Sequence, residues 1–332
     1  MIENKIKEII ANFFPVSNEP KITITEKRII IELSNIPYNE DLSDKLKISL
    51  TQIFPDKKSS VIFTEEKKSN LANETTNKWN ISNVKHIIGI ASGKGGVGKS
   101  TTAVNLALAL ANLNKKVALV DADIYGPSIP TMLGYEGQPL TSFDGIKFEP
   151  FCEYGIKSVS IGSLIEKNTP VIWRGAKACG AIEQLLTQTN WGKIDILVID
   201  MPPGTGDILI TLSQKVNFDG IVIISTPQDI ALIDAIKGVN MFKKIDIPIL
   251  GIIENMSYFI CPNCGKKSDI FGHKGARETA ENIGETFLGE IPLHMEIREN
   301  ADNGTPIIIT NPESPHTLAY EEIAKKIIQR ID

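Results

Sequence analysis

Four residues with the spacing of a phosphate-binding loop are the strongest chemical signal in this 332-residue chain. Gly93, Gly98, Lys99 and Ser100 fit the pattern G-x-x-x-x-G-K-[ST]. An apolar stretch precedes the loop and an alanine- and leucine-rich stretch follows it, which predicts the strand–loop–helix context that the pattern requires. Glycines let the backbone turn tightly and direct its N–H groups at phosphate oxygens. Lys99 is expected to reach the β- and γ-phosphates, and the Ser100 hydroxyl to bind Mg²⁺.

ATP contacts are expected along the whole loop and into the first helical turn, because a helix N-terminus favours negative charge. The predicted ATP-binding residues of this segment are Gly93, Lys94, Gly95, Gly96, Val97, Gly98, Lys99, Ser100 and Thr101. Lys94 is a second lysine inside the loop, which a bare phosphate-binding loop does not require.

Carboxylates follow two further apolar stretches. Asp121 and Asp123 lie in VDADIYGPS, where a carboxylate can orient an attacking water or hold the water shell of a magnesium ion. Asp200 ends the stretch ILVID, a Walker B pattern that places a carboxylate near magnesium at the end of a strand. The PPGTGD sequence that follows is typical of a switch region that senses the γ-phosphate.

Cys261 and Cys264 form a C-x-x-C pair within a turn, where two thiolates can share one metal centre. Two thiolates are half of a usual ligand set, and a two-fold dimer would bring two such pairs together. On the residues alone, an iron–sulfur cluster and a structural zinc are equally compatible with four thiolates. A redox-active pair is disfavoured, because no thioredoxin-like helix start after a strand is evident. Cys152 and Cys179 are isolated thiols, and His273 is interpreted as a solvated loop residue.

Apolar strand candidates alternate with helical stretches from residue 85 onward, the pattern of a doubly wound, mostly parallel sheet. The expected strands are His86–Ala91, Lys116–Val120, Asp195–Ile199, Gly220–Ser225, Pro248–Ile253 and Thr286–Ile291. Such sheets bind ligands at the carboxyl ends of their strands, which is where the glycine loop and the aspartates fall. We therefore expect an α/β P-loop NTPase domain over residues 85–332.

Residues 1–66 are expected to form a separate small α+β domain with a docking or regulatory role. Helical spacing over Ile2–Phe14 and Leu42–Ile53 alternates with a strand pair over Lys21–Leu33 and a strand over Ser60–Thr64. Residues 67–84 are polar and lack periodicity, which predicts a flexible linker.

Composition excludes several classes of protein. A formal net charge of −5 argues against a general nucleic-acid-binding surface. No apolar run approaches the ~20 residues that span a bilayer, and the N-terminus lacks a signal-peptide core. Four cysteines in a chain of this length do not form a disulfide framework. The expected location is the cytoplasm.

Five sequences together, GKGGVGKST, DADIYGPS, DMPPGTGD, ENMSYFICPNCG and FGHKGA, resemble the Mrp/ApbC family of iron–sulfur cluster carrier ATPases. The glycine loop itself resembles the deviant Walker A loop of MinD, ParA and the nitrogenase iron protein. The resemblance implies a homodimer that holds a labile 4Fe–4S cluster by Cys261 and Cys264 of each subunit. It also implies that the cluster passes to apoproteins, and we expect an assembly scaffold as a further partner. Our hypothesis is that ATP binding and hydrolysis are coupled to transfer, and slow hydrolysis is expected of a switch ATPase. Residues 1–66 resemble the small domain often fused ahead of Mrp-type ATPases, although they contain no cysteine.

The resemblance also assigns roles to single residues. Lys94 crosses the dimer interface to the partner's nucleotide, and Lys94, Lys99 and Asp123 are the predicted catalytic residues. Asp123 positions the attacking water and Asp121 supports it near the metal. Asn255 hydrogen-bonds the adenine edge, for which an amide that both donates and accepts is suited. The predicted magnesium residues are Ser100, Asp121 and Asp200.

The alternative function is a MinD/ParA-like positioning or partitioning switch with a structural zinc between subunits. Membrane targeting would need a basic amphipathic C-terminal helix, but the charges over Leu318–Ile331 are nearly balanced. A DNA-binding version would need a basic patch, and none is evident. A nitrogenase-iron-protein-like electron donor is a third option, but the cluster cysteines of those relatives lie far apart in sequence. Neither a nucleic acid nor a stably bound membrane is therefore an expected partner.

Overall fold

The computed structural model describes residues 2–11, 13, 20–24, 28–34, 40–64, 78–164, 175–261, 263–272 and 274–332. The chain divides into two compact units, Met1–Thr75 and Thr76–Asp332. Lys78 Nζ donates a hydrogen bond to the Val216 carbonyl, and the Trp79 N–H donates to the Lys215 carbonyl, so this part of the expected linker is bound to the second unit. The limits proposed from the sequence, 1–66, 67–84 and 85–332, stay predictions.

The first unit has the element order expected from its sequence. Its elements are α1 (Ile2–Ala11), β1 (Lys21–Ile24), β2 (Arg28–Ser34), α2 (Glu40–Ile53) and β3 (Lys58–Thr64). β1 pairs antiparallel with β2, and β2 pairs parallel with β3. The apolar faces of the two helices cover this sheet, with Ile6, Ile29 and Leu46 fully buried between them. The apolar side chains of the alternating strands and of the helices therefore pack together in one small core.

The second unit is built on a mostly parallel sheet with the strand order β11-β10-β9-β4-β8-β5-β7-β6, and β12 also pairs with β10. The strands are β4 (Val84–Ser92), β5 (Val117–Asp121), β6 (Phe151–Glu153), β7 (Ile156–Ser160), β8 (Ile194–Asp200), β9 (Gly220–Ser225), β10 (Ile249–Ile260), β11 (Lys267–Ser268) and β12 (Phe287–Leu293). Each predicted strand is present, so the expected fold class is confirmed. Among the strands named here for the described residues, β6, next to β7, and β11, next to β10, pair antiparallel.

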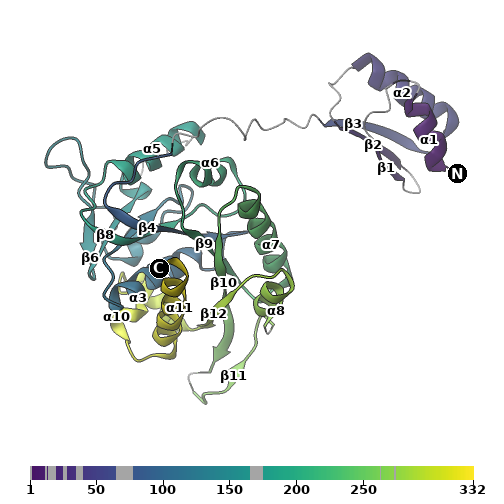
Figure 1. Ribbon diagram of the computed structural model, residues 1–332. Coiled ribbons are helices and arrows are strands. Elements are labelled where there is room, and N and C mark those ends of the chain that lie inside the picture. Colours follow the sequence, from purple (N-terminus) through teal and green to yellow (C-terminus); the bar gives the residue numbers. More distant parts are fainter. Residues whose placement is uncertain are drawn as a thin grey trace. The chain divides into compact units, whose positions relative to one another are not determined.

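Helices cover both faces of this sheet (Figure 1). They are α3 (Lys99–Asn112), α4 (Ile129–Met132), a short 3-10 helix (Ile161–Leu164), α5 (Gly175–Thr187), α6 (Asp207–Lys215), α7 (Asp229–Lys244), α8 (Gly275–Asn282), α9 (Met295–Asp302), α10 (Ile307–Thr310) and α11 (Pro315–Ile331). None of the helices in the described part of the chain is long and apolar enough to cross a bilayer.

Two hydrophobic cores follow from the alternation of side chains along the strands. Leu197 and Ile199 of β8 face the core under α5 to α8, while Ile196 and Val198 face the core under α3 and α11. Because successive side chains of a strand point to opposite faces, a strand buried on both faces is apolar at every position. This explains why the central strands were visible as continuous apolar runs.

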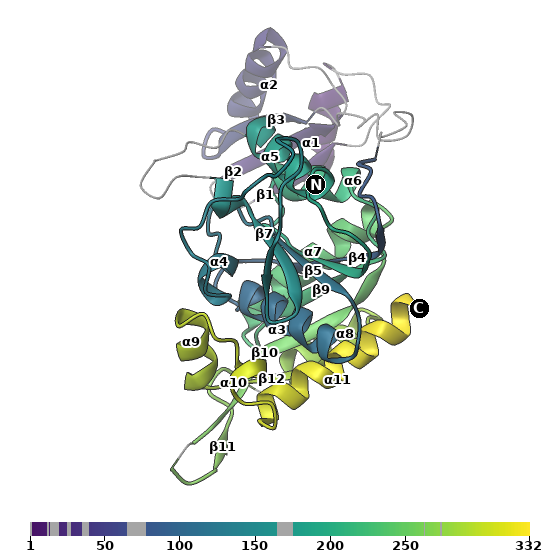
Figure 2. The ribbon, with the colours of Figure 1, turned by 90° about the vertical axis from the view of Figure 1, so that its left-hand side faces the viewer.

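Two strands of the sheet, β7 and β10, differ from the expectation. β7 was not predicted because it carries buried serines, Ser158 and Ser160, in place of a continuous apolar run. β10 was expected to end at Ile253 but continues to Ile260. Its pairing with β12 shifts register between Asn255 and Phe259, and Met256 adopts a positive φ of 56° there, so a bulge interrupts the pairing before it resumes at Phe259. The ENM sequence therefore lies within a strand, and Figure 2 shows the β10–β11 hairpin projecting from this unit.

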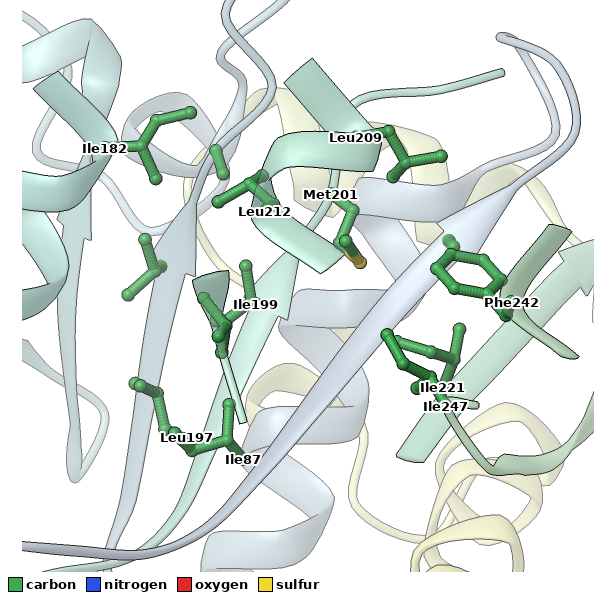
Figure 3. Packing of buried hydrophobic residues seen from close by; sticks show 14 of the residues in the cluster. Ile87, Ile182, Leu197, Ile199, Met201, Leu209, Leu212, Ile221, Phe242 and Ile247 are labelled. Atoms are coloured by element: carbon green, nitrogen blue, oxygen red, sulfur yellow. The ribbon is translucent and has the colours of Figure 1, made fainter. Parts of the chain in front are cut away.

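The packing of α7 gives a test of the core. Figure 3 shows Phe242 of α7 beside Ile221 and Ile247, and its side chain is 1% exposed. We expect Phe242→Ala to lower the free energy of unfolding by about 3–5 kcal/mol, because it leaves a cavity in a close-packed core. Urea denaturation checks this value. Ile233→Ala is the control on the same helix: its side chain is 54% exposed, and a change within about 0.5 kcal/mol is expected. Equal losses in the two variants would contradict the packing described.

Candidate functional site

The glycine loop joins β4 to α3 with its backbone amides open to a ligand. Gly96 and Gly98 have φ values of 81° and 79°, a left-handed conformation that side chains disfavour. No side chain caps the N-terminus of α3, and its first turn carries no acidic residue. Its first N–H groups therefore have no side-chain acceptor, which is the arrangement that binds phosphate. A Cβ added at Gly95 or Gly96 would meet no atom within 4 Å, so this side of the loop has room for a ligand.

Close approach of two neighbouring elements holds the loop in place. A Cβ at Gly93 would lie 2.2 Å from the carbonyl carbon of Asp234 in α7, and one at Gly98 would lie 2.2 Å from Asn255 Nδ2. Asn255 Nδ2 donates a hydrogen bond to the Val97 carbonyl at 2.8 Å. The Val97 side chain is buried in the core. The amide nitrogen of Asn255 therefore supports the phosphate-binding loop, and its predicted contact with adenine stays a prediction.

The strand ends bring the charged residues of the site together. Lys99, only 6% exposed, donates through Nζ to Asp200 Oδ1 at 2.6 Å. The same Nζ atom lies 3.4 Å from Asp123 Oδ2 and donates to Ser100 Oγ at 3.3 Å. β4 and β5 both pair with β8, which aligns the ends of these three strands. Predicted residues from three separate motifs thus share one cluster.

A buried carboxylate oxygen in this cluster fits a magnesium ion. Asp200 is fully buried and its Oδ2 has no hydrogen-bond partner, while burial raises its pKa and Lys99 opposes that rise. An unsatisfied buried anionic oxygen is costly unless a ligand pairs with it. The Ser100 hydroxyl lies in the same cluster, because Lys99 Nζ donates to both Ser100 Oγ and Asp200 Oδ1. Carboxylate and hydroxyl oxygens are ligands that Mg²⁺ prefers, so these residues suit the ion.

Asp121 has a separate structural task. Its Oδ1 accepts from the Asp123 N–H at 3.2 Å, and its Oδ2 accepts from Ser128 N, Ile129 N and Ser160 Oγ at 3.0–3.2 Å. Burial, and then the negative charge of Asp200, raise the pKa of Asp121 to about 7. These bonds shape the loop that presents Asp123. A direct role of Asp121 at the metal stays a prediction.

Two cavities of about 210 Å³ each flank the glycine loop. The first is lined by Ser100, Thr101, Asp123 and Pro203. The second lies on the side of the cysteine hairpin and is lined by Thr226, Gln228, Met256 and Phe271. Lys94, Gly95 and Gly96 line both cavities, so the second loop lysine stands between them.

The C-x-x-C pair lies where β10 turns into β11. The Cys261 N–H donates to the Lys266 carbonyl at 3.0 Å, and the Gly265 N–H donates to the Cys261 carbonyl at 2.8 Å. The backbone N–H groups of Asn263 and Cys264, followed by the Cys264 side chain, lower the pKa of the Cys261 thiol, which favours the thiolate that binds metal. Cys264 is exposed, and both thiols are free.

In one copy of the chain, the described residues place no third metal-binding side chain beside Cys261 and Cys264. Within the described residues, no group of three or more His, Cys, Asp or Glu side chains could hold a metal ion. The other two cysteines are remote from the hairpin: Cys152 is exposed on β6 and Cys179 is half-buried in α5. His273 and Pro262 lie outside the described residues.

The family model of ParA, described as NUBPL iron-transfer P-loop NTPase, matches residues 83–328. The chain belongs to this family. It is 50% identical over 254 residues to the iron-sulfur cluster transfer protein NUBPL of Dictyostelium discoideum, which covers 76% of this chain and 78% of that protein. It is 52% identical over 255 residues to the iron-sulfur cluster carrier protein of Escherichia coli K12, covering 77% and 69% of the two chains.

A solved structure agrees with the fold of this NUBPL-family chain. The nucleotide-binding protein of Archaeoglobus fulgidus, in complex with ADP and with cobalt found in it, matches with a TM-score of 0.62 and 36% identity. The match covers 72% of this chain and 92% of that one. The resemblance to cluster carrier ATPases and the expected P-loop NTPase fold are both confirmed.

The sequence analysis assigned no role to Glu254, the residue before Asn255. Glu254 is fully buried, and its Oε1 accepts from Ser257 Oγ at 2.5 Å while its Oε2 accepts from the Ala276 N–H at 2.7 Å. The available signal was a carboxylate directly after an apolar strand, since buried charges are rare unless they are paired or hydrogen-bonded.

Asp121 makes stability depend on pH. Its pKa of about 7 lies above the ordinary value of 3.8, so between these pH values the folded chain holds a proton that the unfolded chain has released. This contribution is complete below about pH 4 and is lost as pH rises through about 7. We expect nucleotide-free wild type to lose more unfolding free energy between about pH 5 and pH 8 than Asp121→Asn, which cannot titrate. Urea denaturation at both values measures this, and equal losses would contradict the assignment.

Proposed function

We propose that this chain is an ATPase that, as a homodimer, holds an iron–sulfur cluster between its two copies and transfers it to apoproteins. The observation that carries the proposal is a C-x-x-C pair that offers two free thiols, without a third ligand among the described residues, in a chain that also has a nucleotide site. Relatives at 50–52% identity are named as iron-sulfur cluster transfer and carrier proteins, which supports the same role here.

The cysteine hairpin suits a cluster that must be released. Two copies contribute two thiolates each, which completes the four-thiolate set of a 4Fe–4S cluster. Backbone N–H groups of Asn263 and Cys264 lower the pKa of Cys261 and so favour its thiolate, and the exposure of Cys264 leaves the cargo accessible to a client protein. An assembly scaffold that loads the cluster would use the same access.

The nucleotide site suits a slow, switch-type ATPase. Amides of Gly95, Gly96 and the α3 N-terminus would bind the phosphates, while Lys99 neutralises charge between the β- and γ-phosphates. Asp123 would orient the water whose oxygen attacks the γ-phosphorus as the bond to ADP breaks. Ser100 and Asp200 would hold Mg²⁺, which supplies further positive charge to the phosphates when bound. Lys94 would reach the nucleotide of the partner copy.

ATP has to draw Lys99 away from two carboxylates. In the described site its ammonium group is held by Asp200 and lies near Asp123. Binding therefore exchanges these contacts for phosphate, and Mg²⁺ would replace the lost positive charge beside Asp200. The net charge of −5 gives no support for a nucleic-acid partner, and we propose a cytoplasmic location without stable membrane association.

The cysteine pair is tested first by anaerobic reconstitution with iron and sulfide. About four irons and four sulfides per dimer are expected in wild type, and we expect this content to be lost in Cys261→Ala and Cys264→Ala because each removes two of the four thiolates per dimer. Iron and sulfide assays with absorption spectra measure the content. Cys152→Ala is the matched control, an exposed free cysteine outside the hairpin. Tight zinc without a reconstitutable cluster would instead favour the alternative, a MinD/ParA-like switch with a structural zinc.

The nucleotide site is tested by Lys99→Ala. We expect this variant to lose ATP hydrolysis and the activation of an apo client protein, while iron and sulfide loading stays near the wild-type content, because Lys99 contacts phosphate and not the thiols. Lys193→Ala removes an exposed lysine and is the control. Wild-type client activation by Lys99→Ala would contradict the coupling of transfer to ATP.

A further inference from the structure

One strand serves both sites. β10 carries Asn255, which contacts the glycine loop, and ends directly before Cys261. Five residues separate Asn255 from Cys261, and six residue-to-residue steps along a strand span at most roughly 20 Å. A displacement of the loop can therefore reach the cysteine turn through a single hydrogen-bonded element.

Asn255 fixes the nucleotide end of this strand. Its side chain is 7% exposed and donates to the Val97 carbonyl. The absence of a side chain at Gly98 is required for this approach, since a Cβ there would overlap Asn255 Nδ2. Gly98 precedes α3 and Val97 lies within the loop, so any movement of the loop on phosphate binding acts directly on Asn255.

Glu254 fixes the base of the cysteine loop. Beyond Ser257, β10 continues to Ile260, and the chain then carries both cysteines and β11 before it reaches Ala276 in the first turn of α8. The two oxygens of the fully buried Glu254 carboxylate accept hydrogen bonds from these two flanking residues. The Glu254 side chain thus joins the two ends of the segment from Ser257 to Ala276, which carries Cys261 and Cys264.

Glu254 and Asn255 are neighbours on β10, and the backbone between them and the cysteine hairpin departs from regular strand geometry. Successive side chains of a strand point to opposite faces, so Asn255 can meet the glycine loop while Glu254 meets α8. Met256 follows at a φ of 56°, where the register with β12 shifts. α8 is itself docked tightly, since a Cβ at Gly275 would lie 2.7 Å from the Pro227 carbonyl oxygen. A displacement of Asn255 therefore acts on the cysteine loop, whose other end is held in place by the packing of α8.

We propose that Glu254 is a positioning residue for the cysteine pair, and that Glu254 and Asn255 together couple occupancy of the nucleotide site to the metal affinity of Cys261 and Cys264. This inference rests on the proposed function, because it concerns the same two sites. Such coupling is reciprocal: if the nucleotide changes the metal affinity by a factor, the metal changes the nucleotide affinity by the same factor.

The test measures Co²⁺ affinity by thiolate-to-cobalt absorption, without nucleotide and with saturating Mg²⁺ and a non-hydrolysable ATP analogue. In wild type we expect the two affinities to differ about fivefold or more. Asn255→Ala should bring this ratio close to one without changing the nucleotide-free Co²⁺ affinity. Glu254→Ala should also bring the ratio of the two Co²⁺ affinities close to one. It should keep the metal-free affinity for the analogue, which shows that the variant is folded.

Two further variants separate positioning from a general loss of structure. Glu254→Gln keeps an acceptor for the Ala276 N–H and a donor for the Ser257 hydroxyl, so it should restore most of the ratio. Ser257→Ala removes one of the two hydrogen bonds and should give an intermediate ratio. Ser268→Ala, an exposed position on β11, should behave as wild type.

The outcomes distinguish the two proposals. A wild-type ratio of one, or a ratio retained in both Glu254→Ala and Asn255→Ala, overturns the coupling and leaves cluster binding by the cysteines intact. Co²⁺ binding that is unchanged in Cys261→Ala and Cys264→Ala overturns the proposed function as well.

Discussion

The buried contact between Lys99 and Asp200 is the interaction on which the nucleotide site depends. Both groups are withdrawn from water, and such a pair persists only where its geometry compensates for lost hydration. That geometry comes from the sheet: β4 delivers the loop before Lys99, and β8, paired beside it, delivers Asp200 at the same edge. The pairing of two parallel strands therefore decides whether the lysine meets its carboxylate.

The unsatisfied oxygen of Asp200 marks the place where this arrangement is incomplete without a ligand. A buried carboxylate with one lysine contact and one free oxygen is poised for a cation. Asp121, by contrast, has both oxygens occupied by the loop that follows it. Asp200 and Asp121 both end an apolar strand, but they differ in their contacts. Asp200 has an oxygen available for a ligand, whereas the oxygens of Asp121 accept hydrogen bonds that order a loop.

β10 relates this site to the cysteine hairpin. Its neighbours on both sides are parallel strands, which hold its first half in the core, and after a bulge its second half continues to the cysteine turn. Asn255 and Glu254 sit at that transition and bind elements on opposite faces. A strand that is rigid at one end and projects at the other is a suitable element for joining a nucleotide site to a metal-binding turn.

The sequence by itself determined the glycine loop, the central strands and the two-thiol turn. In each case the signal is local: glycine spacing, apolar runs and C-x-x-C spacing need no knowledge of distant contacts. Tertiary structure alone decided that Lys99 meets Asp200, that Asp121 orders a loop, and that Glu254 holds Ser257 and Ala276. These pairings join residues far apart in the chain, or depend on which backbone N–H groups lack another acceptor. A sequence pattern cannot reveal them, because strand order and burial arise only when the whole sheet is assembled.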